Sequence, residues 1–226
     1  MAIVYEDIKP WGRLLGEYVG MFALTEADFH KRILGCSDGP ASFNAEMTAQ
    51  GYRVTSVDPL YAMSAAQIEQ RVQETWQEIL AQVRDNMEMF VWTKFKTPDE
   101  LGEARLSAMR QFIADYETGK AEERYLEGSL PQLPFEDHQF ELALCSNFLF
   151  LYDEHFTDDF HIEAVRELCR VADEVRIFPL HGLQNTLAKQ VAPVEAALRA
   201  DGWQVERVVV DYEFRHGSNR MLRLTR

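Results

Sequence analysis

Hydrophobic and polar positions along the chain follow two different periods, which predict short buried strands separated by amphipathic helices. Short runs of apolar and β-branched residues are typical of buried strands, and apolar residues three and four positions apart are typical of helices. We expect strands at residues 32–36, 53–58, 124–127, 141–146, 174–180, 204–214 and 219–226. We expect helices at residues 6–23, 41–50, 162–171 and 185–200, with a short helix after the cap pair Thr25 and Asp28.

The order of these elements predicts an α/β protein with a mostly parallel seven-stranded sheet. Alternating strands and helices place helices on both faces of a parallel sheet. A turn at residues 215–218 joins the last two strands, so an antiparallel hairpin is expected at the C-terminal edge. At 226 residues the chain is expected to form a single domain, 1–226, which begins with N-terminal helices at 1–31.

The connection between the second and third expected strands is longer than a single crossover helix needs, and we assign residues 62–122 to a helical insertion. Ser64 and Gln67 form a capping box, and Thr97 with Pro98 marks the start of a second helix. Apolar stripes on both helices predict a helical hairpin. Two roles stay open. The stripes pack only on each other and on the sheet, or the hairpin is a lid or cap at the carboxyl edge of the sheet.

A turn of small residues follows the first expected strand, in the run Gly35-Cys36-Ser37-Asp38-Gly39-Pro40. The second expected strand ends in Asp58. A strand, a tight turn, a helix and an acid at the end of the next strand are typical of a nucleotide site, because the turn exposes backbone N–H groups and the carboxylate accepts ribose hydroxyls. The pattern therefore predicts a nucleotide-containing cofactor.

Charge and composition narrow the range of partners. Asp and Glu number 37 against 23 Lys and Arg, and the formal net charge is −14, so nucleic acids and anionic membranes are not expected partners. We expect no metal, because the histidines and cysteines lack ligand spacing. No apolar run is long enough for a membrane span and no signal peptide is expected, which favours a cytoplasmic monomer or homodimer. The acidic charge favours a small neutral or cationic substrate.

Taken in order, these features resemble the class I S-adenosylmethionine-dependent methyltransferases over nearly the whole chain. Residues 35–41 lie where that family has its glycine-rich loop, and Asp58 lies where it has the acid that closes strand two. Residues 128–141, Gly-Ser-Leu-Pro-Gln-Leu-Pro-Phe-Glu-Asp-His-Gln-Phe-Glu, look like the family's segment from the adenine-binding turn into strand four. The resemblance implies a Rossmann-like three-layer sandwich, S-adenosylmethionine as the cofactor and methyl transfer to a small-molecule acceptor.

The resemblance also implies a set of cofactor-binding residues: Gly35, Ser37, Asp38, Gly39, Asp58, Pro59, Ser129, Leu130, Ser146, Asn147 and Tyr18. Three positions depart from the family pattern. Gly35 stands where an acid usually precedes the loop glycines, Ser37 replaces the first of those glycines, and Ser129 replaces an acid that contacts adenine. Asp38 is a candidate to compensate for the missing acid at position 35.

Catalytic and acceptor-binding side chains are less specific in the sequence. Tyr152, His155 and His181 follow the fourth and fifth strands, where a histidine could act as a general base, although a surface or supporting position explains each histidine more simply. Trp92, Phe95 and Tyr152 are candidates for the wall of an acceptor pocket, with simple packing as the other interpretation. Methyl transfer from a sulfonium needs mainly alignment, so no fixed catalytic motif is required.

Other functions share part of this pattern. A nicotinamide-dependent oxidoreductase also has a strand, a loop, a helix and a ribose acid, but Gly-x-Gly-x-x-Gly is missing here. A methyltransferase-like protein that binds the cofactor without methyl transfer would explain the departures at 35, 37 and 129, and a lyase using the same cofactor is a further alternative. Titration with the two cofactors and analysis of products distinguish these functions.

Overall fold

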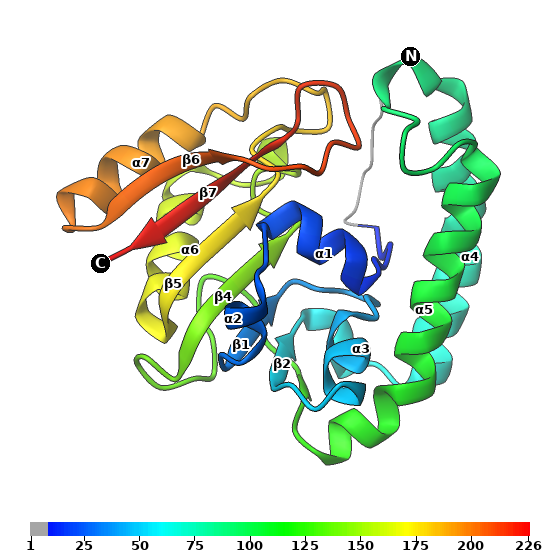
Figure 1. Cartoon of the computed structure of the whole chain (residues 1–226), viewed down its shortest axis with the longest axis horizontal. Helices are drawn as coiled ribbons and strands as arrows, with labels where there is room; N and C mark the ends of the chain where they lie inside the picture. Colours follow the sequence, from blue (N-terminus) through cyan, green and yellow to red (C-terminus); the bar gives the residue numbers. More distant parts are fainter. Residues whose placement is uncertain (1–8) are drawn as a thin grey trace.

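The computed structural model describes residues 9–226 and centres on one seven-stranded sheet (Figure 1). Its strands are β1 Ile33–Cys36, β2 Val54–Val57, β3 Tyr125–Leu126, β4 Phe140–Ser146, β5 Ala172–Phe178, β6 Gln204–Val209 and β7 Arg220–Thr225. They lie in the order β3-β2-β1-β4-β5-β7-β6. β7 pairs antiparallel with β5 and β6, whereas the pairs among the first five strands are parallel. The expected mixed sheet with an antiparallel C-terminal hairpin is confirmed.

Helices cover both faces of the sheet, so the expected three-layer sandwich is also confirmed. They are α1 Leu15–Phe22, α2 Glu26–Phe29, α3 Phe43–Ala49, α4 Ala65–Asp85, α5 Pro98–Ala121, α6 Asp158–Val171 and α7 Val191–Ala200, with 3-10 turns η1 Pro59–Ala62, η2 Met87–Met89 and η3 Asp153–His155. Leu142 and Leu144 of β4 pack in one apolar cluster with α1 and α3. Ala143 and Cys145 pack in another with α6 and α7. Alternate residues of a strand point to opposite faces, and this period separates the two cores.

Local cap chemistry explains where the two long helices begin. The Ser64 hydroxyl accepts from the Gln67 N–H, and the Gln67 side chain accepts in return from the Ser64 N–H at 2.9 Å, at the start of α4. Thr97 Oγ1 accepts from the Glu100 N–H at 3.1 Å, ahead of Pro98 at the first position of α5. The first N–H groups of a helix have no partner inside it, and these caps supply one. None of the helices between residues 9 and 226 combines the length and apolarity that crossing a bilayer requires.

Three expected elements differ from the structure by about five residues or more at one end. Residues 9–14 are not helical, and α1 begins only at Leu15; positions 6–8 of that expected helix lie outside the described residues. Residues 185–190 form turns before α7. The strand expected to reach residue 214 leaves the sheet after Val209. In these segments apolar side chains such as Trp11 and Phe214 pack against the helical insertion, and such packing needs no regular spacing.

The helical insertion lies along one side of the sandwich, with α5 in front of α4 in Figure 1. Its closed end, residues 86–97, contacts the loop between β6 and β7. The Val91 N–H donates to the Phe214 carbonyl at 2.9 Å, and the His216 N–H donates to the Met89 carbonyl at 3.1 Å. Because β6 runs parallel to β5 through the intervening β7, that loop belongs to the carboxyl edge of the sheet.

A buried ion pair joins the insertion to the first helix. The Glu17 carboxylate of α1 accepts from both terminal nitrogens of Arg105 of α5, and from the Tyr212 hydroxyl at 2.7 Å. Both charged side chains are 0% exposed. Burial by itself would raise the pKa of Glu17, but the guanidinium groups of Arg105 and Arg13 lower it to about 2. The charge pair therefore stays ionised inside the fold.

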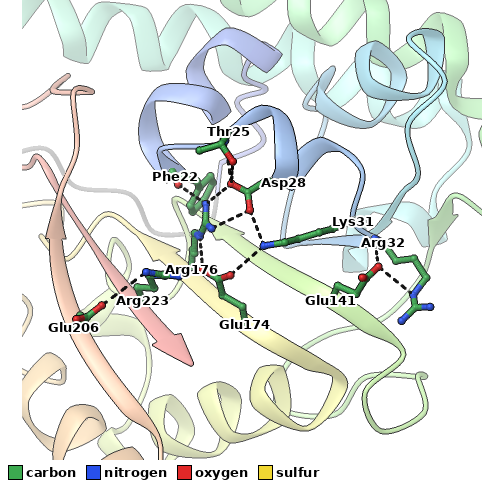
Figure 2. A network of polar contacts seen from close by, with 10 residues as sticks. All are labelled: Phe22, Thr25, Asp28, Lys31, Arg32, Glu141, Glu174, Arg176, Glu206 and Arg223. Carbon is green, nitrogen blue, oxygen red and sulfur yellow. Dashed lines mark hydrogen bonds and ion pairs between the residues drawn. The ribbon is translucent and has the colours of Figure 1, made fainter. Parts of the chain in front are cut away.

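A second polar network fixes the far end of α1 (Figure 2). Arg176 of β5 donates to Asp28 Oδ1 at 3.1 Å, to Glu174 Oε1 at 2.8 Å and to the carbonyl of Phe22 at 2.9 Å. Phe22 is the last residue of α1, so the guanidinium also satisfies a carbonyl that the helix leaves open. This contact fixes the helix that carries Tyr18 over the sheet.

Candidate functional site

A cavity of about 510 Å³, called the large cavity below, lies at the carboxyl ends of β1, β2 and β4. The strand order reverses direction between β1 and β4, the position at which ligands bind in open α/β sheets. Most of the residues expected to bind the cofactor line it: Ser37, Asp38, Gly39, Asp58, Pro59, Ser129, Leu130, Ser146 and Asn147. The fold thus brings four distant segments of the chain to one space.

Asp38 places a buried carboxylate at this cavity. Its Oδ1 accepts from the Tyr18 hydroxyl at 2.8 Å, and its Oδ2 accepts from the Ser56 hydroxyl at 2.8 Å. Burial raises the pKa of Asp38 to about 7, although the two hydroxyls act in the opposite direction. Tyr18 is fully buried and does not line the cavity itself; its contribution is the hydrogen bond to the Asp38 carboxylate. A carboxylate with a pKa near neutrality is well placed to gain from a cationic ligand group.

Gly35 accounts for the position of that carboxylate. A Cβ built at position 35 would lie 1.8 Å from Oδ2 of Asp38 and 2.6 Å from its Cγ. The Asp38 carboxyl group therefore occupies the space in which a side chain at position 35 would begin. A side chain at position 35 and the carboxyl group of Asp38 in its present place exclude each other.

The turn after β1 uses left-handed backbone at two positions. Ser37 has a φ of +58° and Gly39 a φ of +54°, a region that glycine tolerates best. The Tyr61 hydroxyl donates to the Gly39 carbonyl at 2.8 Å, which holds the turn from the side of η1. Ser37 thus adopts a backbone conformation that favours glycine.

Asp58 connects this turn to the end of β2. Its Oδ2 accepts from the Gly39 N–H at 2.9 Å, and its Oδ1 accepts from the Leu60 N–H at 2.8 Å. Burial raises the pKa of Asp58, and these two backbone donors oppose that effect. A carboxylate oxygen accepts more than one hydrogen bond, so both oxygens can take a further donor. The structure shows the capping role, and a ribose diol is compatible with it.

The far side of the large cavity is mostly apolar. Leu60 and Met63 line it from the segment after β2, Leu130 from the segment after β3, and Phe156 and Phe160 from the segment after β4. The rings of Phe156 and Phe160 stack with centroids 4.3 Å apart. A flat heterocycle fits such a surface better than a charged group does.

The structure places four of the expected catalytic and substrate residues outside both spaces. His155 and His181 line neither the large cavity nor the smaller chamber beside it, and nor do Trp92 and Phe95. Phe95 is buried against Phe214, and the Trp92 indole donates to the carbonyl of Met87, so both aromatics pack the closed end of the insertion. Of the five candidates, only Tyr152 lines the two spaces.

The sequence interpretation missed the extended segment at residues 9–13. Lys9, Trp11 and Arg13 line both spaces. The segment docks on the turn after β1: the Ser42 N–H donates to the Arg13 carbonyl at 3.1 Å, and a Cβ on Gly12 would lie 2.1 Å from the carbonyl oxygen of Pro40. The glycine between Trp11 and Arg13 was the available signal, since a mid-helix glycine is unfavourable and marks close backbone contact instead.

None of the three cysteines lines the large cavity or the smaller chamber. Cys36, Cys145 and Cys169 are buried free thiols, and burial raises the pKa of Cys169 to about 12. Within residues 9–226, no three His, Cys, Asp or Glu side chains are grouped as metal ligands.

Comparison with known proteins relates the chain to one protein by sequence and to others by fold. No family model matches it. It is 33% identical over 222 residues to an uncharacterized protein of Methanocaldococcus jannaschii, covering 98% of this chain and 97% of that protein. The magnesium protoporphyrin IX methyltransferase of Synechocystis PCC 6803, solved with bound S-adenosylmethionine, aligns with a TM-score of 0.50 at 11% identity, over 94% of this chain and 77% of that one. The mitomycin 7-O-methyltransferase MmcR aligns with a TM-score of 0.50 at 12% identity, over 94% and 53%. At 11% and 12% identity, the two structural alignments show a shared fold.

Proposed function

The chain belongs to the family of the uncharacterized Methanocaldococcus jannaschii protein and has the fold of the class I S-adenosylmethionine-dependent methyltransferases, and from this premise we propose that it is itself such an enzyme, acting on a small-molecule acceptor. The two proteins compared by structure act, by their names, on a porphyrin and on a mitomycin. We also propose a cytoplasmic location. The single observation that carries the activity is a pair of carboxylates, Asp38 and Asp58, at one cavity large enough for the cofactor.

The residues at the large cavity fit S-adenosylmethionine. Asp38 would take the ammonium of the methionine part, for which its raised pKa and buried position leave an uncompensated carboxylate. Asp58 would accept the ribose hydroxyls, and the apolar surface at Leu60, Met63 and Leu130 would contact the adenine. A space of about 510 Å³ lies within the usual range for sites of this ligand size.

The cofactor, when bound, supplies an electrophilic methyl group, and the protein supplies alignment. Alignment alone is worth roughly 7–11 kcal/mol in favourable cases, so the reaction does not require a catalytic triad. Asn147 and Tyr152 line both the large cavity and the adjoining chamber. This position supports a place beside the path between cofactor and acceptor. We assign them to orienting the acceptor and excluding water.

Calorimetric titration of the protein with S-adenosylhomocysteine, S-adenosylmethionine and NAD tests the proposal. We expect both sulfur compounds to bind one per chain and NAD not to bind. Binding of NAD alone would overturn the assignment in favour of an oxidoreductase. Binding without methyl transfer to any acceptor in a metabolite extract would reduce it to cofactor binding, and breakdown of the cofactor itself would indicate a lyase.

Asp58→Ala is expected to weaken binding of S-adenosylhomocysteine at least about tenfold. The variant loses the two hydrogen bonds that the carboxylate would accept from the ribose hydroxyls, each worth roughly 1.5–3 kcal/mol, and leaves the Gly39 N–H without its acceptor. Calorimetry gives the dissociation constant, and a circular dichroism melt confirms the fold. The exposed Asp211, which lines neither space, provides the matched control Asp211→Ala. An unchanged dissociation constant in folded Asp58→Ala would remove Asp58 from the site.

Asp38 is expected to make binding depend on pH. Its pKa in the folded protein is about 7, above the ordinary 3.8, so the unbound protein loses stability as the pH rises between those values. A cationic ligand group favours the ionised form, so the dissociation constant of S-adenosylhomocysteine should fall about tenfold between about pH 6 and pH 8. Asp38→Asn should bind weakly at both pH values and lose the dependence. A wild-type dissociation constant that does not change between these pH values would contradict this role.

We further propose that the helical insertion caps the cofactor. Met63 and Arg71 line the large cavity, and Ile79 and Val83 of α4 line the adjoining chamber. Hydrogen exchange with and without S-adenosylhomocysteine should therefore show slower exchange in α4 as well as around Gly39. Helix α7, on the opposite face of the sheet, should not change. Slowing confined to the turn at Gly39 would leave the insertion a packing or dimer-forming element.

A further inference from the structure

A chamber of about 70 Å³, called the inner chamber, adjoins the large cavity on the side away from the apolar surface at Leu60, Met63 and Leu130. The two spaces share Lys9, Trp11, Arg13, Asn147 and Tyr152 in their walls. Most of the remaining wall of the inner chamber comes from α4, from the end of β5 and the segment after it, and from the loop between β6 and β7, and Phe90 and Leu151 complete it. A volume of this size holds about five water molecules, which suits one small chemical group rather than a whole substrate.

The charged residues in the wall of the inner chamber are all basic. Lys9, Arg13 and Arg215 line it, and no Asp or Glu of residues 9–226 does. In the whole chain the acids outnumber the basic residues by 37 to 23, so a wall of average composition would be acidic. Lys9 has a partner outside the chamber, because its ammonium lies 3.2 Å from Glu78. Arg13 and Arg215 are the other two cations of this wall.

Arg13 is the surplus cation of a buried cluster. Glu17 is the one carboxylate of the described residues that acts on Arg13, and it is already occupied by Arg105 and by the Tyr212 hydroxyl. Arg13 donates to the carbonyl of Trp11 at 3.1 Å, and among residues 9–226 no carboxylate lies within ion-pair distance of its guanidinium. Two guanidinium groups with one carboxylate leave a net positive charge at the wall of the chamber. Such a charge is costly to desolvate unless an anion accompanies it.

Two hydroxyl groups complete the set of donors. Ser218 is 2% exposed, and its Oγ has no hydrogen-bond partner among the described residues. Tyr152 is also buried, and its oxygen accepts from the Lys9 N–H at 3.2 Å, which leaves its own proton to be donated. Guanidinium groups and hydroxyl donors around a small space match the acceptor oxygens of a carboxylate or a phosphate. A buried hydroxyl without a partner would gain such a bond on binding.

We propose that the inner chamber binds the anionic group, a carboxylate or a phosphate, of the molecule that receives the methyl group. The inference rests on the proposed methyltransferase function and specifies its substrate class. It replaces the expectation of a neutral or cationic substrate, because net charge describes the protein surface whereas Arg13 and Arg215 decide the potential inside the chamber. Aromatic neighbours such as Phe90 and Phe214 favour an apolar body next to the anion.

Arg13 alone would not distinguish this inference from binding of the cofactor's own carboxylate, since it lines both spaces. Arg215 and Ser218 line only the inner chamber. The Arg215 side chain donates to the Leu183 carbonyl at 2.8 Å, which orients it in the chamber wall. Variants at these two positions should therefore affect acceptor analogues and leave the cofactor unaffected.

The test is calorimetric titration of the S-adenosylhomocysteine-saturated protein with four matched probes: benzoate, phenyl phosphate, benzyl alcohol and benzylamine. We expect at least one of the two anions to bind one per chain, and the alcohol and the amine to bind at least about tenfold more weakly. Tighter binding of benzoate or of phenyl phosphate would identify the anion. Equal binding of benzylamine, or no binding of either anion, would overturn the proposal.

The variants are Arg215→Gln, Arg215→Lys and Ser218→Ala, with the exposed Arg110→Gln on α5 as the control. We expect Arg215→Gln to weaken the anion about tenfold, Ser218→Ala to weaken it a few-fold, and Arg215→Lys and Arg110→Gln to retain it. The dissociation constant of S-adenosylhomocysteine should stay the same in all four. Unchanged anion affinity in folded Arg215→Gln would overturn the proposal. Failure of the cofactor titration itself would instead count against the methyltransferase function, and the anions would then be titrated alone.

Discussion

Replacing Gly35 with alanine is expected to abolish cofactor binding and to destabilise the protein. The added Cβ would lie 1.8 Å from Oδ2 of Asp38, so the carboxyl group must leave its position between Tyr18 and Ser56. Displacing it breaks two hydrogen bonds of a buried acid, each worth roughly 1.5–3 kcal/mol, and removes the proposed partner of the ligand ammonium. We expect the dissociation constant of S-adenosylhomocysteine to rise at least about a hundredfold.

A paired exchange separates this explanation from simple damage to the fold. Gly35→Asp combined with Asp38→Gly moves the carboxylate from the turn to the strand, the arrangement that the family usually has. The double variant should recover much of the affinity lost in Gly35→Ala. The control is Gly16→Ala in α1, where an added Cβ meets nothing within 4 Å; it should be neutral or slightly stabilising. If the paired exchange binds no better than Gly35→Ala, the carboxylate is not what the ligand needs.

Removing one partner of the buried ion pair between Glu17 and Arg105 is expected to lower the free energy of unfolding by about 3–5 kcal/mol, because the other charge is left buried alone. The two ends should not be equivalent. Glu17→Ala leaves Arg105 and Arg13 together without a carboxylate, whereas Arg105→Ala leaves Glu17 with Arg13 nearby. We therefore expect Glu17→Ala to be the more destabilising of the two. Urea denaturation at neutral pH measures both.

The exposed pair of Arg84 and Asp99 is the comparison for this effect, since Asp99→Ala should cost about 1 kcal/mol or less. The buried pair also predicts a dependence on pH. Because the pKa of Glu17 is about 2, below the ordinary 4.5, its stabilising contribution is present above 4.5 and is lost as the pH falls toward 2. Equal losses for the buried and the exposed pair would show that the insertion is held by apolar packing alone.

The strands of the sheet, its antiparallel C-terminal hairpin and the start of both long helices followed from local patterns. Cap motifs such as Ser64 with Gln67 act over three residues, and an apolar strand such as β4 is buried on both faces whatever its neighbours are. For the same reason Asp58 was placed correctly at the cavity, because an acid directly after a parallel strand lies at the carboxyl edge. The helices that periodicity predicted at residues 9–14 and 185–190 are absent, because the packing of these segments is irregular.

What the sequence by itself determined is therefore the α/β fold, the insertion and the segments that meet at the large cavity. Only the tertiary structure decided that Asp38 fills the space above Gly35, that Arg13 lies at the site, and that Trp92 and Phe95 do not line it. The physical reason is the distance along the chain over which each effect acts. Helix caps and strand burial depend on neighbours along the chain, whereas the charge state of a buried group depends on whichever side chains the fold brings to it. Arg13 becomes a surplus cation only because Arg105, from the distant α5, takes the carboxylate of Glu17.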